Sequence, residues 1–397
     1  GPHDTNPRKS FSRIGIDTLT GRPQISKQWA NAVDPGAVAE IDGGQQQHAS
    51  RKQSPIDDYQ HNQTPHQLHD GLPWVVKHAE NQFRDPARIW LNAGKLPFPR
   101  YEVEMKANYQ IGLAEKFLEQ HKDKQFALWL SFHEPHSPYD FPVDDRNLID
   151  AKRFTPPKVG PEDAWQIPKI FRPLTIEDKQ GIIASYYTSV AYLDRNIGRV
   201  LAKLKQLNLE EDTLVVYTAD HGYDLGHHGR FEKHCFYQPA MHVPLMFRWP
   251  GKLQAGKTIR HATESVDVSP TIARLFGLKE RFPKTHGRDL FLDRPRDEIF
   301  SVYLENEEAC LIWENWKLIY TTGRRKRMDG YESGNPTPGR IVRLYDRRHD
   351  PEEQTNVAVK HPALVETLTH KLHDKFLTTH PEPGLTLDEY LRPRDTA

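Results

Sequence analysis

Residues 185–222 read SYYTSVAYLDRNIGRVLAKLKQLNLEEDTLVVYTADHG, and this stretch decides the fold. Its first part carries apolar side chains at helical spacing, namely Val190, Leu193, Ile197, Val200, Leu201 and Leu204. We therefore expect a helix over roughly residues 181–207. An apolar strand over residues 213–218 follows and ends at Asp220-His221-Gly222. An amphipathic helix that leads into a buried strand is typical of α/β proteins.

The flanking sequence repeats this alternation. Apolar spacing predicts a helix over roughly residues 104–121, and the continuous apolar run at 126–130 predicts a strand covered on both faces. We expect a further strand at 243–249, followed by a short helix that has Ser269 as its N-cap and ends at Gly277. The predicted fold class is α/β, with an open mixed sheet flanked by helices.

The pattern changes after about residue 295. Short strands are predicted at 298–304, 309–313, 316–321 and 341–345, before a helix over 360–377. We therefore expect a domain over residues 1–295 and a small antiparallel α+β subdomain over 296–397. Residues 143–180 are expected to be irregular, and the polar stretch 44–69 to be a surface excursion.

Composition excludes several classes of protein. Lys+Arg and Asp+Glu both number 54 among the 397 residues, so the formal net charge of zero argues against a nucleic-acid partner. No apolar run reaches the 18 or so residues of a membrane span. Two cysteines, Cys235 and Cys310, are too few for a disulfide framework. None of these features bears on the oligomeric state.

Polar clusters follow two of the predicted strands, where α/β sheets bind their ligands. His133-Glu134-Pro135-His136 follows the first strand, and the Asp220-His221 pair after the second suits half of a metal site. The loop that comes next is cationic and suits an oxyanion such as sulfate or phosphate, through His227, His228, Arg230, Lys233 and His234. Ordinary strand ends and solvated loops give the same patterns, so the residues alone leave both interpretations open.

Several longer stretches together resemble the sulfatase family of the alkaline phosphatase superfamily. These are TADHGYDLGHHGRFEKHCFYQPAMHVPLMFRWPG at 218–251, LWLSFHEPHSPYDFP at 128–142, ESVDVSPTIARLFGL at 264–278 and RLYDRRHDPEEQTN at 343–356. The HVPL ending and the position of Lys233 are most similar to the iduronate-2-sulfatase-like branch. The resemblance covers about residues 100–360, and its motifs occur in the family's order. It implies an alkaline-phosphatase-like fold.

The resemblance also implies roles for single residues. Asp220 and His221 would bind a divalent cation, taken to be calcium, although an Asp-His pair also suits zinc or manganese. His136 would be the general acid for the leaving oxygen, and Lys233 would hold a sulfate oxygen. The competing interpretations are a loop-packing histidine and a solvated lysine. The candidates for substrate binding are His133, Tyr223, His227, Arg230 and His234.

The chain departs from the family pattern in one respect. Sulfatases carry a paired aspartate, a G-K-x-H-like stretch and a C/S-x-P-S-R motif whose Cys or Ser becomes formylglycine, and none of these occurs here. Asp57-Asp58 lies in the polar excursion and is rejected as the metal pair. We interpret residues 1–17, with the turn at 14–17, as the continuation of the missing motif. The N-terminal portion with the nucleophile would then be absent, and this chain alone would be inactive.

The implied function is that of a sulfuric ester hydrolase acting on a sulfated sugar or polysaccharide. The parent enzyme would use a metal-bound formylglycine nucleophile. The alternatives are a phosphodiesterase or phosphonate monoester hydrolase of the same superfamily, or an inactive sulfatase-like module that binds sulfated glycans. Family resemblance implies a periplasmic, extracellular or lysosomal location.

Overall fold

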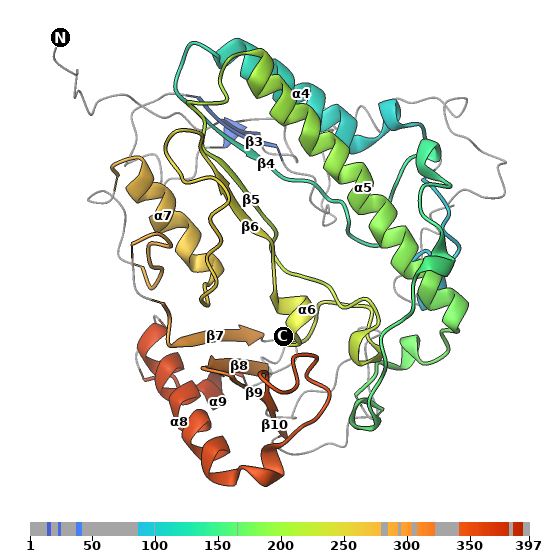
Figure 1. The fold of residues 1–397 in the computed structure, drawn as a ribbon, viewed down its shortest axis with the longest axis vertical. Coiled ribbons are helices and arrows are strands. Elements are labelled where there is room, and N and C mark those ends of the chain that lie inside the picture. Colours follow the sequence, from blue (N-terminus) through green and yellow to red (C-terminus); the bar gives the residue numbers. More distant parts are fainter. Residues whose placement is uncertain are drawn as a thin grey trace. The chain divides into compact units, whose positions relative to one another are not determined.

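The computed structural model describes two compact units that interleave along the chain, and each is presented by itself (Figure 1). The first contains residues 1–155, 174–215 and 247–254, and the second contains 156–173, 216–246 and 255–397. The described residues, with side chains, are 86–98, 100–164, 166–278, 285–292, 295–303, 308–321, 341–380 and 384–391. For 14–16, 23–24 and 37–41 only the backbone is described. The predicted domain boundary at residue 295 stays a prediction.

The first unit contains a four-stranded sheet in the order β2-β1-β3-β4. Its strands are β1 (Ile14–Ile16), β2 (Pro23–Gln24), β3 (Ala37–Ile41) and β4 (Phe126–Leu130). Strand β3 pairs in parallel with both β1 and β4, and β2 pairs antiparallel with β1. The sheet is therefore mixed, as predicted. The turn expected at 14–17 is instead, over its first three residues, strand β1.

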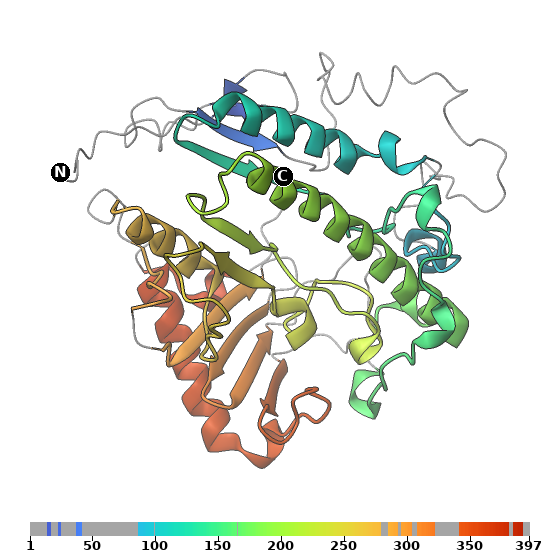
Figure 2. The same cartoon turned by 45° about the horizontal axis from the view of Figure 1, so that its top comes forward.

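Two helices of the first unit, α4 (Lys106–His121) and α5 (Ile176–Gln206), run side by side (Figures 1 and 2). Phe117, Leu118 and Leu204 of these helices are buried against Phe126 and Leu128 of β4. The intervening side chains of β4 face the other way, and Trp129 is 64% exposed. Coverage of β4 on both faces was therefore a wrong prediction. The apolar run buries one face against the helices, with strand periodicity.

Two helix starts differ from the prediction. Helix α5 begins at Ile176, because Thr175 accepts a hydrogen bond from the amide of Asp178 and the Asp178 carboxylate accepts one from the amide of Thr175. Helix α7 (Val268–Leu275) has Asp267 at its N-cap position, so Ser269 lies inside the helix and is not the cap. The short helix α3 (Ala87–Trp90) belongs to the first unit.

The second unit contains an antiparallel sheet in the order β10-β9-β8-β7. Its strands are β7 (Glu298–Tyr303), β8 (Glu308–Trp313), β9 (Trp316–Thr321) and β10 (Ile341–Asp346). Helix α8 (Pro362–Thr379) packs on β8 and β9, burying Leu368, Leu372 and Phe376 against Leu311 and Leu318. The C-terminal antiparallel α+β arrangement is confirmed. The short helices α6 (Gln238–Met241) and α9 (Leu387–Tyr390) also belong to this unit.

The predicted strands at 213–218 and 243–249 are β5 (Val215–Thr218) and β6 (Leu245–Arg248), which form a two-stranded pair. The irregular stretch expected at 143–180 contains four short 3-10 turns, Val143–Asp145, Ala151–Arg153, Pro161–Asp163 and Lys169–Phe171, before α5 begins. The polar excursion at 44–69, with Asp57-Asp58, lies outside the described residues. Within the described part, no helix combines the length and apolar character needed to cross a membrane.

Candidate functional site

The Asp220-His221 pair follows strand β5, as the sequence predicted. The Asp220 carboxylate accepts a hydrogen bond from the His221 amide at 2.9 Å, and its second oxygen lies 3.4 Å from His221 Nε2. His221 Nδ1 lies 2.7 Å from the Gly222 carbonyl oxygen. Because a carbonyl can only accept, Nδ1 carries the proton, and this leaves Nε2 facing the carboxylate.

Protonation decides what this pair can bind. Burial lowers the pKa of His221, and the nearby positive charge of Lys233 lowers it further, against the opposing effects of the Gly222 carbonyl and the Asp220 carboxylate. The ring is therefore neutral at neutral pH, with a lone pair on Nε2. Two acceptors that face each other at 3.4 Å repel unless a cation lies between them.

The pair consequently fits the role of two ligands of a divalent cation. Among the residues that the structure describes, no group of three or more His, Cys, Asp or Glu side chains could hold a metal, so the pair supplies half a site at most. Calcium takes about six to eight oxygen ligands, whereas imidazole suits zinc and manganese better. The identity of the metal therefore stays a prediction.

Gly222 is required for close packing of the backbone and does not provide space for a ligand. Its amide donates to the Ala240 carbonyl at 2.8 Å, and the Tyr223 amide donates to the Pro239 carbonyl at 2.8 Å. A Cβ atom on residue 222 would lie 2.0 Å from the Pro239 oxygen. The glycine therefore permits a close approach of two chain segments.

The stretch from Asp224 to Glu232 is a closed loop. The Asp224 amide donates to the Glu232 carbonyl and the Gly226 amide to the Arg230 carbonyl, each at 2.8 Å. Gly226 has φ of +100° at the turn. Tyr223, a substrate-binding candidate, donates its hydroxyl to the Phe231 carbonyl at 2.7 Å. Lys233 follows directly after this closed loop.

A buried polar network fixes the inner side of this loop. His228 is 1% exposed, lies 2.9 Å from the Asp163 carboxylate through Nδ1, and stacks on Tyr237 with ring centroids 3.5 Å apart. Gln166 donates to Asp163 at 2.9 Å and accepts from Arg343 at 2.6 Å. The network joins three segments of the second unit that are far apart in sequence.

The remaining cationic candidates of the loop have different surroundings. The Arg230 guanidinium pairs with buried Glu232 and donates to the Gln166 carbonyl at 2.9 Å. His227 is partly exposed, and its Nε2 lies 3.8 Å from the Glu352 carboxylate. The positive charge of Arg230 is therefore matched within the protein, which makes its proposed contact with substrate the weakest of the set.

His133 and His136 lie together in the first unit, after strand β4. Their ring centroids are 4.7 Å apart, and the His136 amide donates to the His133 carbonyl at 2.9 Å. His136 Nδ1 donates to the Ser137 carbonyl at 2.9 Å, so Nε2 is the ring nitrogen whose protonation can change. Trp90 of α3 contacts the ring edge-on. This geometry suits a general acid that acts through Nε2.

The sequence did not predict that two carboxyl groups of these regions are buried. Burial raises the pKa of Glu134 to about 7 in the first unit, and burial raises that of Asp224 to about 7 in the second. Each is flanked by candidate residues, but an acidic residue within a polar motif gives no sequence signal of burial. Asp163 was missed for the same reason.

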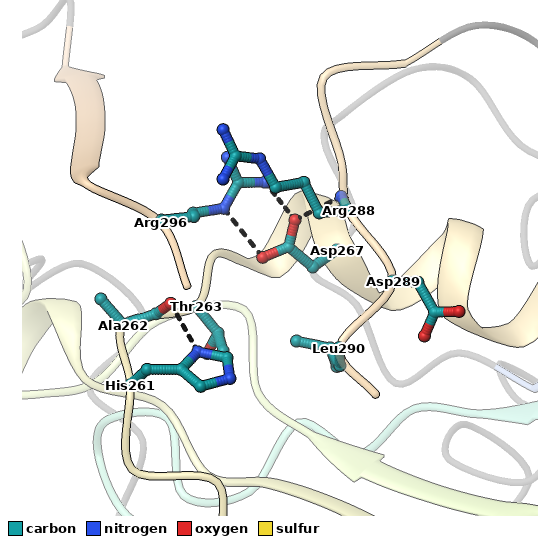
Figure 3. A pocket seen from close by; sticks show the side chains of 8 residues that line it. All are labelled: His261, Ala262, Thr263, Asp267, Arg288, Asp289, Leu290 and Arg296. Atoms are coloured by element: carbon teal, nitrogen blue, oxygen red, sulfur yellow. Dashed lines mark hydrogen bonds and ion pairs between the residues drawn. The ribbon is translucent and has the colours of Figure 1, made fainter. Parts of the chain in front are cut away.

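A small pocket elsewhere in the second unit is structural (Figure 3). The Asp267 carboxylate in its wall accepts hydrogen bonds from Arg296 Nε at 3.0 Å and from the Arg288 amide at 2.7 Å. Figure 3 shows the Arg296 guanidinium directed at this carboxylate and the His261 ring turned toward the Ala262 carbonyl. These hydrogen bonds hold Arg288 and Arg296 at Asp267, the N-cap residue of α7.

Solved structures define the class of fold. A phosphonate monoester hydrolase from Silicibacter pomeroyi superposes with a TM-score of 0.60 at 21% identity, covering 82% of this chain and 69% of that one. A sulfatase-like protein from Bacteroides fragilis gives a TM-score of 0.57 at 23% identity, covering 72% and 61%. The fold is therefore the alkaline-phosphatase-like fold shared by sulfatases and phosphonate hydrolases.

Sequence comparison then identifies the family. The sulfatase family model matches residues 39–278, and a model of the N-sulphoglucosamine sulphohydrolase C-terminal region matches 226–381. The chain belongs to the sulfatase family. Human arylsulfatase K is 27% identical over 305 residues, covering 67% of this chain and 53% of the relative. Human iduronate 2-sulfatase is 29% identical over 199 residues, covering 39% and 36%. The chain thus spans about half the length of arylsulfatase K, or less in the case of iduronate 2-sulfatase.

Proposed function

We propose that this chain carries the cation-binding and sulfate-binding part of a sulfuric ester hydrolase. The observation that supports it is the proximity of the Lys233 ammonium to the Asp220-His221 pair, which lowers the pKa of His221. A cation and an ammonium group together neutralise the negative charge that collects on the sulfate oxygens during S–O cleavage. Asp220 and His221 would hold the cation, which we take to be calcium, and Lys233 binds a sulfate oxygen.

His136 is proposed as the acid that protonates the leaving oxygen. Its Nδ1 proton is held by the Ser137 carbonyl, so the ring presents Nε2 for proton transfer. His133 orients the ring by its contact at 4.7 Å between centroids. Without such an acid, the sugar oxygen would have to leave as an alkoxide, and alkoxides are poor leaving groups.

The nucleophile is not among these residues. The 397 residues contain no C/S-x-P-S-R motif, so no formylglycine can form within them by the family route. We therefore expect this chain by itself to give background turnover of sulfate esters. Robust turnover by these residues alone would contradict both the missing nucleophile and the assigned chemistry.

The proposed substrate is a sulfated carbohydrate. A structural neighbour with a TM-score of 0.57 and 19% identity was solved with its substrate D-glucosamine-2-N,6-O-disulfate, covering 69% of this chain and 70% of that one. The candidate substrate residues are His133, Tyr223, His227, Arg230 and His234. We propose a periplasmic, extracellular or lysosomal location, as the family resemblance implies.

The second candidate function is hydrolysis of phosphonate monoesters or phosphodiesters. The structural similarity to the phosphonate monoester hydrolase supports it, because the oxygens of tetrahedral phosphoryl and sulfuryl groups can be bound in the same way by a cation and a lysine. An inactive module that binds sulfated glycans is the third candidate, since the anion-binding residues are present without a nucleophile.

Ligand binding to the chain tests these candidates. We expect methyl sulfate to bind in titrations followed by NMR, more tightly with added calcium, and more tightly than methyl phosphonate. Lys233→Ala should weaken methyl sulfate binding about tenfold, as expected for loss of a charge-assisted hydrogen bond. The exposed Lys252 provides the matched control, Lys252→Ala, which should leave binding unchanged. Tighter binding of the phosphonate, or an unchanged affinity in Lys233→Ala, would contradict the sulfatase assignment.

A further inference from the structure

A pair of half-buried side chains lies next to the proposed sulfate ligand in the second unit. His234, which follows Lys233 in the chain, makes a hydrogen bond through Nδ1 to the hydroxyl of Tyr303. The two ring centroids are 5.7 Å apart, and the ring planes are inclined by 36°. The partners come from segments separated by 69 residues, so the contact joins the cationic loop to the C-terminal sheet.

Both members of the pair are held in place by the fold. Tyr303 is the last residue of β7, opposite Glu308 in the register of β8. Its ring packs on a cluster that includes buried Phe236 and Tyr237, which follow His234 in the chain. His234 directly follows Lys233, so their Cα atoms are about 3.8 Å apart. The hydrogen bond to Tyr303 therefore anchors the residue next to the proposed sulfate ligand.

The chemistry of the pair suits a sugar ring. A tyrosine presents an apolar face together with a polar tip, and this combination matches the C–H faces and hydroxyl groups of a carbohydrate. Imidazole adds a group that can donate or accept a hydrogen bond. By contrast, His228 and Asp163 of the neighbouring network are buried and cannot contact a ligand without unfolding the loop.

We propose that Tyr303 and His234 form a saccharide subsite beside Lys233, which takes the sugar ring of a sulfated carbohydrate. This inference rests on the proposed sulfatase function, because Lys233 sets the position of the sulfate. Tyr303 determines specificity and takes no part in S–O cleavage. A sulfated sugar should therefore bind more tightly than a simple alkyl sulfate, and the difference should depend on Tyr303.

Two probes distinguish the subsite from the sulfate site. Methyl sulfate tests the sulfate site without a sugar, and D-glucosamine-2-N,6-O-disulfate tests the sulfate site and the subsite together. In NMR titrations Tyr303→Ala should weaken binding of the sulfated sugar about tenfold, the effect of about 1.4 kcal/mol, and leave methyl sulfate unchanged. Tyr303→Phe retains the ring and loses the hydroxyl that bonds to His234, so it should lose less affinity. Tyr187→Ala, at an exposed tyrosine of the first unit, is the matched control.

The outcomes separate the two hypotheses. If the wild-type chain binds methyl sulfate but gains nothing from the sugar, or if Tyr303→Ala affects both probes equally, the subsite is overturned and the sulfate site stands. If the wild-type chain binds neither probe, the proposed function is overturned and the subsite with it. Unfolding curves that match the wild type for Tyr303→Phe show that its loss of affinity reflects the lost contact and not misfolding.

Discussion

Asp163→Ala should destabilise the second unit severely, because this carboxylate is the centre of the buried network. Asp163 is 3% exposed and accepts three hydrogen bonds, from the Gly160 amide at 3.0 Å, Gln166 Nε2 at 2.9 Å and His228 Nδ1 at 2.9 Å. Burial raises the pKa of Asp163, but His228 and the hydrogen bonds from Gly160 and Gln166 together outweigh burial and lower the pKa overall. The native state therefore stabilises the ionised form.

The magnitude follows from the donors left behind. Alanine would remove the acceptor of three donors, the Gly160 amide, Gln166 Nε2 and His228 Nδ1, and each buried donor left unsatisfied costs about 1–3 kcal/mol. We therefore expect a loss of about 3–5 kcal/mol from a total of about 5–15 kcal/mol. Asp163→Asn keeps the shape and one acceptor oxygen, so it should cost about 1–3 kcal/mol.

Urea unfolding at neutral pH measures this loss, with the exposed Asp123→Ala as the control that should stay within about 0.5 kcal/mol of the wild type. A double-mutant cycle of Asp163→Asn with His228→Gln should give a coupling energy above about 0.5 kcal/mol. Because the native pKa of Asp163 is lowered, its contribution is present above the unfolded pKa near 3.8 and is lost as pH falls through the folded value. A cost below about 1 kcal/mol for Asp163→Ala would refute the central role of the carboxylate.

Three further predictions concern the second unit. Gly222→Ala should lower the free energy of unfolding in urea by more than about 3 kcal/mol and weaken methyl sulfate binding, because the added Cβ would lie 2.0 Å from the Pro239 oxygen. Wild-type stability of this variant would show that the two backbone segments can move apart. Burial raises the pKa of Asp224 to about 7, so its stability contribution is complete below about pH 4 and is lost by up to about 4 kcal/mol as pH rises through 7. Asp224→Asn should therefore flatten the decline in unfolding free energy between pH 4 and 7, and an unchanged slope would show that Asp224 does not titrate there. Glu353→Ala should cost about 3–5 kcal/mol by leaving fully buried Lys317, now 2.8 Å from the carboxylate, without its charge partner; a loss under about 1 kcal/mol would mean that water reaches the ammonium.

Periodicity predicted the elements well where packing and local spacing agree. Helix α4 and strands β4, β8, β9 and β10 lie within one or two residues of their predicted bounds. Helix α4 and strand β4 each bury one stripe or face, whereas β8 and β9 are buried along nearly their whole length. The start of α5 was missed because the Thr175 and Asp178 side chains, and not an apolar residue, begin the helix. The exposure of Trp129 was missed because a continuous apolar run does not reveal which of its faces is covered.

The surroundings of the candidate residues could be predicted only in part. A motif identifies the types of side chain present, and Lys233 is close enough to His221 to help lower its pKa. It does not show which side chains turn inward, since that depends on partners far away in sequence. Asp163 lies 65 residues before His228, and Glu352 lies 125 residues after His227, so neither contact has a local signal.

The cationic loop shows how contacts with residues far away in sequence change the function that a motif suggests. Taken as a cluster, its five cationic or titratable residues suggest one strong anion-binding surface. The structure pairs two of them with buried carboxylates, since His228 contacts Asp163 and Arg230 contacts Glu232. A buried and neutralised charge adds little to the field outside the loop, but it fixes the backbone from which Lys233 and His234 project.

Removing the inner pairs should therefore weaken binding by displacing Lys233, whereas removing Lys233 itself should weaken binding with the fold intact. Comparing the unfolding free energy with methyl sulfate affinity in the Asp163→Asn and Lys233→Ala variants distinguishes positioning from direct contact. Equal stability and equal loss of affinity in both variants would mean that the inner pairs also face the ligand.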